Sequence, residues 1–258
     1  IQWNAESLKR HEARTGQHVY TCCAEDFVPG RESGLTMRER LAITLATTKH
    51  SGKLDERVDV AVGMRVMVLF NISTEADLAN GTRGDITGII LDSREPAPFA
   101  TDPATGHTLL KYPPAAVLFK PDSSTFPALD GLPAGVIPVV PSTAKFTVKS
   151  GDGKVTITRR QLAMTAGYAF TDYKSQGQTI GYALIDLGKP PTGALTPFSA
   201  YVALSRSHGR ENIRILRGFD TKLFTTHPSE MLRREDARLD GLTLETQTRY
   251  PANVSISA

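Results

Sequence analysis

The stretch YAFTDYKSQGQT, residues 168–179, decides the fold, because an apolar and aromatic run gives way within it to hydroxyls, amides and glycine. Its first half is typical of the end of a buried strand. Its second half, Ser175–Thr179, can cap a helix through short hydroxyl side chains. The same residues can also meet a phosphate group, because Gly177 permits a close approach of the backbone. Both interpretations place the stretch at a strand-to-helix turn of an α/β domain.

The segments that flank this stretch alternate between strand and helix patterns. Strands are predicted for 163–171, 182–188 and 212–219, and helices for 198–207 and 227–242, the last with Pro228 near its first turn. Strands that alternate with helices imply a parallel sheet with crossover connections. Residues 161–258 are therefore predicted to be α/β.

The upstream sequence begins helical and then changes to a β pattern. Helices are predicted for Ala5–Arg14, capped by Asn4, and for Thr36–Thr47. Strands follow, and ten of the sixteen prolines fall between residues 96 and 141, which favours edge strands and long loops. The predicted strands are 60–69, 84–92, 115–119 and a hairpin of 145–149 with 154–158. We predict an α/β domain in two parts, 1–57 and 161–258, interrupted by a small β-barrel insert at 58–160.

Composition places the chain among ordinary globular proteins. Of its 258 residues, 40% are hydrophobic and 22% are charged, with a net charge of +3. Lys and Arg gather locally, with six against two acids in residues 145–174 and eight against five in residues 206–238, which indicates phosphate contacts or an ordinary solvated face. No metal-ligand spacing and no run of 18 apolar residues occurs, so neither a metal site nor a membrane span is predicted. The chain begins at Ile1 in mid-domain sequence, and we expect it to be a piece of a longer protein.

The usual nucleotide-binding loop is missing from the sequence. No G-x-x-x-x-G-K-[ST] occurs, and no apolar strand ends in Asp-Glu to hold Mg²⁺. The chain is therefore not expected to bind and hydrolyse a nucleotide by itself in the manner of phosphate-loop enzymes.

Two motifs in order, with two linking segments, carry a resemblance to a known family. YAFTDYKSQGQT, 168–179, and YVALSR, 201–206, resemble the fifth and sixth motifs of superfamily-1 DNA helicases. VGMRVMVLFNISTEADLANGTRGDI, 62–86, and RRQLAMT, 159–165, are similar to segments of the PIF-type (petite integration frequency) 5′-to-3′ helicases, which are close to the RecD-like ones. The fungal, transposon-associated members are the most similar. The resemblance covers most of residues 58–220.

The resemblance implies a fold and a mechanism. The chain would be the second RecA-like domain of such a helicase with its β-barrel insert, and an upstream RecA-like domain would hold most of the ATP and Mg²⁺. Arg206 would be the arginine finger, whose guanidinium suits the charge on a transferring γ-phosphoryl group. Without the family, Arg206 is an ordinary helix arginine. Gln176, Gly177 and Gln178 would face the nucleotide.

DNA contacts are implied for two regions. Thr171, Tyr173, Lys174 and Ser175 would lie near the DNA backbone, although Tyr173 replaces the usual histidine and Asp172 would repel phosphate unless it pairs with a cation. In the insert, the predicted hairpin contributes a second set of candidates: Lys145, Lys149, Lys154, Arg159 and Arg160. Phe146 on the same hairpin could stack on a base or pack in the core.

Three functions remain to be compared. The first is the C-terminal motor half of an ATP-dependent 5′-to-3′ DNA helicase, a monomer that acts on single-stranded DNA and DNA forks. Its setting would be repair, recombination or telomere maintenance in the nucleus or the mitochondrion. The second is a non-catalytic nucleic-acid-binding module derived from a helicase. The third is an α/β enzyme with Ser175 or Ser205 as nucleophile, which the missing G-x-S-x-G elbow disfavours.

Overall fold

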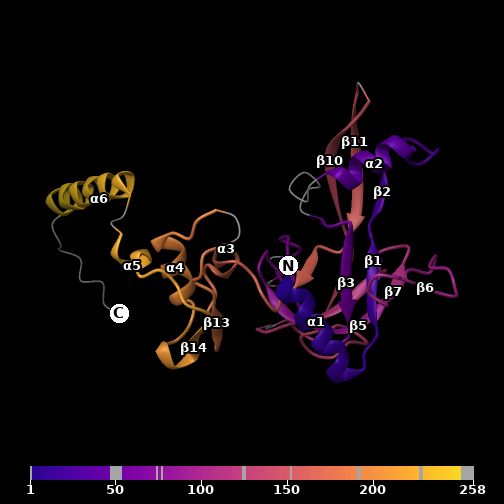
Figure 1. Ribbon diagram of the computed structural model, residues 1–258, viewed down its shortest axis with the longest axis horizontal. Helices are drawn as coiled ribbons and strands as arrows, with labels where there is room; N and C mark the ends of the chain where they lie inside the picture. The colour runs from indigo at the N-terminus through magenta and orange to yellow at the C-terminus, as the bar shows by residue number, and fades with distance from the viewer. Residues whose placement is uncertain are drawn as a thin grey trace. The chain divides into compact units, whose positions relative to one another are not determined.

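The computed structural model describes residues 2–46, 54–73, 75–76, 78–123, 126–151, 153–190, 193–226 and 229–250. The chain divides into two compact units, Ile1–Phe170 and Thr171–Ala258 (Figure 1). We call them unit 1 and unit 2 and describe each by itself. The predicted turn residue 152 and the proline at 228 lie outside the described residues.

Unit 1 is mostly β-structure, arranged in three hydrogen-bonded sheets with the strand orders β3-β1-β7-β6, β10-β11-β2 and β12-β4-β5-β8-β9. Its elements are α1 (Gln2–Thr15), β1 (Val19–Cys23), β2 (Glu25–Phe27), α2 (Met37–Leu45), β3 (Arg57–Ala61), β4 (Arg65–Val68), β5 (Arg83–Ile90), β6 (Ala100–Thr101), β7 (Thr108–Leu110), β8 (Ala116–Pro121), β9 (Ile137–Val139), β10 (Ser142–Ser150), β11 (Gly153–Gln161) and β12 (Met164–Ala166). The described strands do not form one hydrogen-bonded barrel, so the predicted barrel is not confirmed.

The main core of unit 1 is built by α1 together with strands of the β3-β1-β7-β6 and β12-β4-β5-β8-β9 sheets. Val60, Met64, Val66, Phe119 and Leu162 are all buried within it. The predicted strand 60–69 is broken in two, because Gly63 takes a φ of 77° in a turn between β3 and β4. A positive φ of this size favours glycine.

The β10–β11 hairpin is confirmed, and helix α2 packs against one of its faces (Figure 1). Ile43 of α2 shares a small core with Phe146, Val148 and Ile157 of the hairpin. Thr36 begins α2 with a capping box, in which Thr36 and Glu39 each satisfy a backbone N–H of the other. The predicted helix therefore starts where the sequence places it.

The structure groups the chain differently from the three predicted segments. Strand β1, from the predicted first segment, pairs with β3 of the predicted insert, and β2 pairs with β11. These ladder hydrogen bonds tie residues 1–57 to 58–160, and the division falls between Phe170 and Thr171. That residues 1–57 and 161–258 make up one RecA-like domain stays a prediction.

Asn4 does not cap the first helix as predicted. It lies inside α1, where its side-chain amide donates to the carbonyl oxygens of Ala166 and Ala169 and its Oδ1 accepts from the Ala169 N–H at 2.6 Å. The predicted strand 163–171 is also shorter, since only β12 is strand. At and after the end of β12, the Asn4 side chain forms hydrogen bonds with backbone groups that a longer β-strand would pair with a neighbouring strand.

A first prediction concerns Gly84 on β5. A Cβ at this position would lie 2.1 Å from the Lys120 carbonyl oxygen of β8, so Gly84→Ala should separate the two strands. We expect it to lower the free energy of unfolding by about 3 kcal/mol or more, at the upper end of overpacking costs. Urea denaturation followed by the fluorescence of Trp3, the single tryptophan, measures this in unit 1.

The matched control is Gly88→Ala on the same strand. Its Cβ would lie 3.0 Å from Cδ1 of Leu118, the end of a flexible side chain rather than backbone. We expect a clearly smaller loss of stability. Equal losses in the two variants would contradict the assignment of the Gly84 effect to the Lys120 carbonyl.

Unit 2 combines three short helices and the 20-residue helix α6 with a parallel strand pair, β13 and β14, among its described residues. Its elements are α3 (Asp172–Ser175), β13 (Ala183–Ile185), α4 (Pro197–Leu204), the 3₁₀ turn η1 (Arg210–Asn212), β14 (Ile213–Ile215), α5 (Lys222–Thr225) and α6 (Glu230–Arg249). Ile185, Leu187 and Ala200 form its buried core. The predicted order of strand, helix, strand and C-terminal helix is confirmed here. None of the helices described in the chain is long and apolar enough to cross a membrane.

Candidate nucleotide and nucleic-acid sites

The two motif stretches meet in unit 2. Ile180, just after the first stretch, donates its N–H to the carbonyl oxygen of Arg206 at 2.7 Å and forms a parallel bridge with Ser207. Helices α3 and α4 are in contact. The residues proposed for the nucleotide therefore come from neighbouring elements of one unit, although 27 positions separate Thr179 from Arg206 in the sequence.

The turn after α3 leaves its backbone accessible. Gln176 is exposed, and Gly177 has a φ of 78° with no atom within 4 Å of the place where a Cβ would stand. Gln178 is held more firmly, because its Nε2 donates to the Lys174 carbonyl oxygen at 2.9 Å. A glycine with positive φ beside open space permits a ligand to approach the main chain.

Arg206 lies at the C-terminal end of α4 and is half-buried. Its Nε donates to the Val202 carbonyl oxygen at 2.9 Å, and its Nη2 donates to Ser205 Oγ at 2.8 Å. The guanidinium thus caps a carbonyl of the last turn of α4, which also accepts from the Ser205 hydroxyl. These two bonds use two of the five N–H donors of the guanidinium.

Two buried polar atoms near this junction have no hydrogen-bond partner among the described residues. They are Oδ2 of Asp172, at the start of α3, and Oγ of Ser207, directly after Arg206. Orphaned polar atoms are uncommon in folded proteins and concentrate where strain or a ligand explains them. Asp172 forms no described ion pair, so the pairing with a cation that DNA contact would require is not found.

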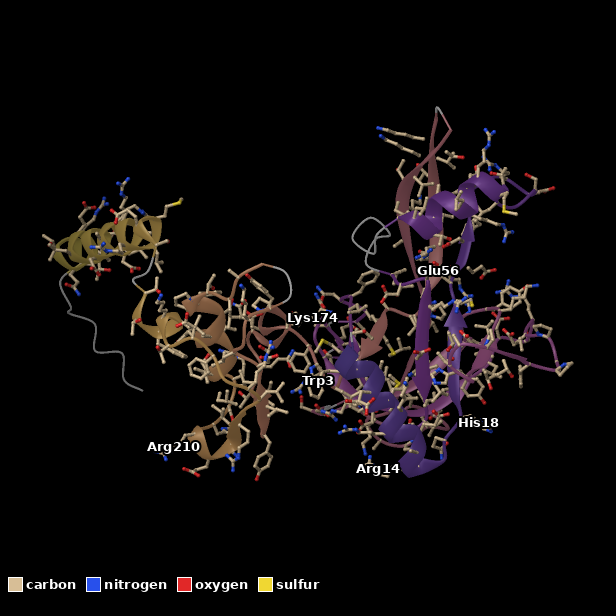
Figure 2. All side chains as sticks on the ribbon, viewed as in Figure 1. Trp3, Arg14, His18, Glu56, Lys174 and Arg210 are labelled. Atoms are coloured by element: carbon tan, nitrogen blue, oxygen red, sulfur yellow. The ribbon has the colours of Figure 1, made fainter. Side chains whose placement is uncertain are left out.

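The four residues predicted to contact DNA in the first stretch differ in accessibility. Thr171, Tyr173 and Lys174 are exposed, and Lys174 is labelled on this unit in Figure 2. Ser175 is 5% exposed, and its Oγ donates to the Asp172 carbonyl oxygen at 2.7 Å. Ser175 is the last residue of α3 and caps no helix start as the capping interpretation predicted, and its hydroxyl proton is engaged within α3 rather than available to a DNA backbone.

Arg159, a predicted DNA contact, lies in the interior of unit 1. Its side chain is 3% exposed, and it forms a two-bond pair with Asp26 in which both distances are 2.7 Å. Its Nη1 also donates to the Leu54 carbonyl oxygen. A buried guanidinium with its donors engaged is a structural ion pair, so Arg159 is removed from the DNA-facing candidates.

The other hairpin candidates face solvent to different degrees. Lys145, Lys149 and Lys154 are exposed and form no described ion pair. Arg160 is half-buried and donates to Glu25, which also accepts from Arg94. The Arg94 hydrogen bond is the main cause of the lowered pKa of Glu25, and Arg160 adds to it. Arg160 therefore neutralises acids, whereas the three lysines are free for a ligand.

Three contacts that sequence reasoning missed anchor the first half of the stretch in unit 1. The hydrogen bonds of Asn4 hold Ala166 and Ala169, and the Tyr168 hydroxyl accepts from the Arg65 N–H. Arg83 lies 5.3 Å from the ring centroid of Phe170. The sequence places Arg65 and Arg83 in one family-like segment and Tyr168 and Phe170 in another, but it does not indicate that they touch, since the partners are far apart in the chain.

The described residues offer groups that can bind a phosphate but no cluster of side chains that could hold a metal ion. The open backbone at Gly177 and the guanidinium of Arg206 suit a phosphate. Within the described part of the chain, no three or more His, Cys, Asp or Glu side chains gather where they could hold a metal ion. Mg²⁺ would need ligands from elsewhere.

Sequence comparison finds several Pif1-type helicases. The chain is 29% identical over 170 residues to "ATP-dependent DNA helicase PIF7" of Trypanosoma brucei brucei, covering 66% of this chain and 16% of that protein. It is 25% identical over 220 residues to "ATP-dependent DNA helicase Pif1" of a Psychrobacter species, covering 79% and 32%. The chain thus spans less than a third of the length of either relative. No protein-family model matches it.

Structural comparison agrees on the fold. The Pif1 helicase from Candida albicans matches with a TM-score of 0.51 and 19% identity, over 93% of this chain and 48% of that one. Bacteroides Pif1 bound to single-stranded DNA matches with a TM-score of 0.53 and 20% identity, over 93% and 44%. The chain is homologous to Pif1-type ATP-dependent DNA helicases over most of its length, and its mixed α/β fold with parallel strand pairs is found in their structures. These matches do not single out a fungal, transposon-associated or RecD-like branch.

Proposed function

We propose that this chain is the C-terminal motor half of an ATP-dependent 5′-to-3′ DNA helicase. It would supply an arginine finger and part of the track for single-stranded DNA, and an upstream RecA-like domain would supply the phosphate loop and the Mg²⁺ ligands. The observation that carries the proposal is the junction of Ile180 with Arg206 and Ser207, which joins the two helicase-like stretches. The homology to Pif1-type helicases supports it.

The chain's own residues have distinct parts in this proposal. Arg206 leaves the Val202 carbonyl and Ser205 hydroxyl and places its guanidinium against the γ-phosphoryl oxygens, where charge spreads in the transition state. Gln176 and Gln178 report the presence of that phosphate without adding charge. ATP supplies the free energy when bound, and domain closure around it would move the DNA. Thr171, Tyr173 and Lys174 would contact the DNA backbone.

A second candidate is a non-catalytic nucleic-acid-binding module. One observation favours it, since the guanidinium of Arg206 is occupied in capping its own helix. Such a module would bind DNA through its cations and make no use of Arg206. Whether it is the motor half or the non-catalytic module, we propose that the protein acts on DNA in the nucleus or the mitochondrion. The process would be repair, recombination, telomere maintenance or transposition.

The chain by itself gives the first test. We expect it to bind single-stranded DNA with an affinity that falls as salt rises, with a log–log slope of about −0.7 for each phosphate contacted. We also expect no ATP hydrolysis, because the residues of the chain hold no phosphate loop. Fluorescence anisotropy and phosphate release measure the two quantities. ATP hydrolysis by the chain alone, or an affinity for single-stranded DNA that does not change with salt, would contradict the proposal.

A further inference from the structure

Three strands of unit 1 align an exposed aromatic ring with the basic hairpin. In the β10-β11-β2 sheet, Thr158 is paired with Lys145 on one side and with Phe27 on the other. Residues directly paired across strands project from the same face of a sheet. Phe27, Thr158 and Lys145 therefore form one row on the face opposite to helix α2.

The ring of Phe27 is not explained by packing. Phe27 is 40% exposed and belongs to no buried cluster of unit 1, whereas Phe146, the aromatic residue on β10, is 6% exposed against α2. Beside Phe27, the Oγ1 of Thr158 is buried and has no described hydrogen-bond partner. The row thus combines an exposed π-face with an incomplete polar group.

The same face becomes basic toward the end of the hairpin. Lys149 is paired directly with Lys154, and like charges in this position destabilise a sheet. No described carboxylate pairs with either lysine. Between these lysines and the row, Thr147 is paired with Thr156 and adds two exposed hydroxyls. Arg38 of α2 also reaches the turn, since its Nη1 lies 3.8 Å from the Cβ position of Gly151.

We propose that this face binds single-stranded nucleic acid, with Phe27 of β2 stacked on one base and the lysines of β10 and β11 holding phosphates farther along the same nucleic-acid chain. We call it the hairpin face and define it by Phe27, Lys145, Thr147, Lys149, Thr156 and Lys154. The proposal rests on the proposed function and deepens it, because it identifies a DNA-binding surface whose residues lie outside the helicase-like motifs of the chain. An anion between Lys149 and Lys154 removes their mutual repulsion.

The combination of groups favours a single strand over other polyanions. Aromatic stacking requires a base whose face is open, and in a duplex both faces are covered by neighbouring bases. An acidic protein segment would satisfy the lysines but has no need of an exposed ring. Because side chains alternate along β10, Lys145 and Lys149 lie on one line, about 14 Å apart at the rise of an antiparallel strand. The phosphates of the bound nucleic acid would therefore run along β10.

The test compares two probes on the whole chain without ATP. A fluorescein-labelled oligo(dT) offers bases and phosphates, and an abasic oligomer of equal length offers phosphates alone. Phe27→Leu keeps apolar volume but loses the π-face, and we expect it to weaken oligo(dT) binding about tenfold while leaving abasic binding unchanged. Phe27→Trp should restore the affinity. Phe99→Leu, at another exposed phenylalanine of unit 1, is the matched control and should change neither.

The lysines are tested through salt. Replacing both Lys149 and Lys154 by alanine should lower the log–log salt slope by about 0.7 per lysine for both probes. Replacing Lys9 and Lys111 by alanine, at exposed positions outside the face, should leave the slope as it was.

Three results would overturn the inference. The first is that Phe27→Leu changes the affinity for neither probe, or changes both affinities equally. The second is that a duplex of equal length binds as tightly as oligo(dT), with or without Phe27. The third is that poly-glutamate displaces oligo(dT) as effectively as unlabelled oligo(dT) does. None of these measurements involves ATP or Arg206. The hairpin face can therefore fail while the motor proposal stands, and the reverse.

Discussion

Arg206→Ala is expected to reduce DNA-stimulated ATP hydrolysis about 10³-fold or more in a protein that joins this chain to the phosphate-loop domain of a Pif1-type relative. The reason is that a guanidinium with five donors stabilises the charge on the γ-phosphoryl oxygens in the transition state, and alanine leaves that charge uncompensated. Arg206→Lys should also be slow, since an ammonium cannot reproduce the planar arrangement of donors. Steady-state phosphate release with saturating single-stranded DNA measures the effect.

The control for this experiment lies four residues further along the chain. Arg210 is a solvated arginine of the same unit whose one ion pair among the described residues is with its neighbour Glu211, and both side chains are more than 80% exposed. Arg210→Ala should leave turnover within about twofold, as expected for a surface change. Affinity for single-stranded DNA should be equal in both variants. Unchanged turnover in Arg206→Ala would refute the finger assignment and favour the non-catalytic module.

The second large effect is expected from Asp26→Ala in unit 1. Asp26 accepts two hydrogen bonds from Arg159, whose side chain is 3% exposed, so its removal leaves a buried guanidinium without a counter-charge. Breaking one side of such a pair typically costs about 3–5 kcal/mol. We expect a loss of that size in the free energy of unfolding, measured by urea denaturation with Trp3 fluorescence.

Two comparisons make this prediction specific. Glu6→Ala removes an exposed i,i+4 pair with Arg10 and should cost about 0.5 kcal/mol or less. Replacing both Asp26 and Arg159 by leucine and methionine should recover most of the loss, because no unpaired buried charge remains. A cost for Asp26→Ala no larger than that for Glu6→Ala would show that Arg159 finds other compensation.

The fold was predictable where the pattern is local. The capping box at Thr36, the β10–β11 hairpin and the alternation of strands and helices in unit 2 were all readable, because each depends on residues a few positions apart. The grouping of residues into units was not. It depends on long-range pairs such as β1 with β3 and β2 with β11, for which the short strand patterns contain no information about the partner.

The candidate site shows the same limit. The two motifs indicated which residues of unit 2 belong to the candidate site. The contact that joins them, the parallel bridge of Ile180 with Ser207, is a pairing that the sequence does not specify. The prediction for Arg159 was misleading because an arginine in a basic hairpin gives no sign of its partner, and Asp26 lies 133 positions away. Phe27 was missed for a similar reason, since only the pairing of β2 with β11 places it in one row with Thr158 and Lys145.

The most direct test of the motor proposal is the rate of ATP hydrolysis, with single-stranded DNA, by three proteins: this chain, the phosphate-loop domain of a Pif1-type relative, and the two joined in order. We predict that only the joined protein hydrolyses ATP in a DNA-stimulated manner, because phosphate loop and Arg206 must act on the same γ-phosphate. A joined protein that is folded and binds nucleotide, yet hydrolyses ATP no faster than the phosphate-loop domain alone, would contradict the proposal.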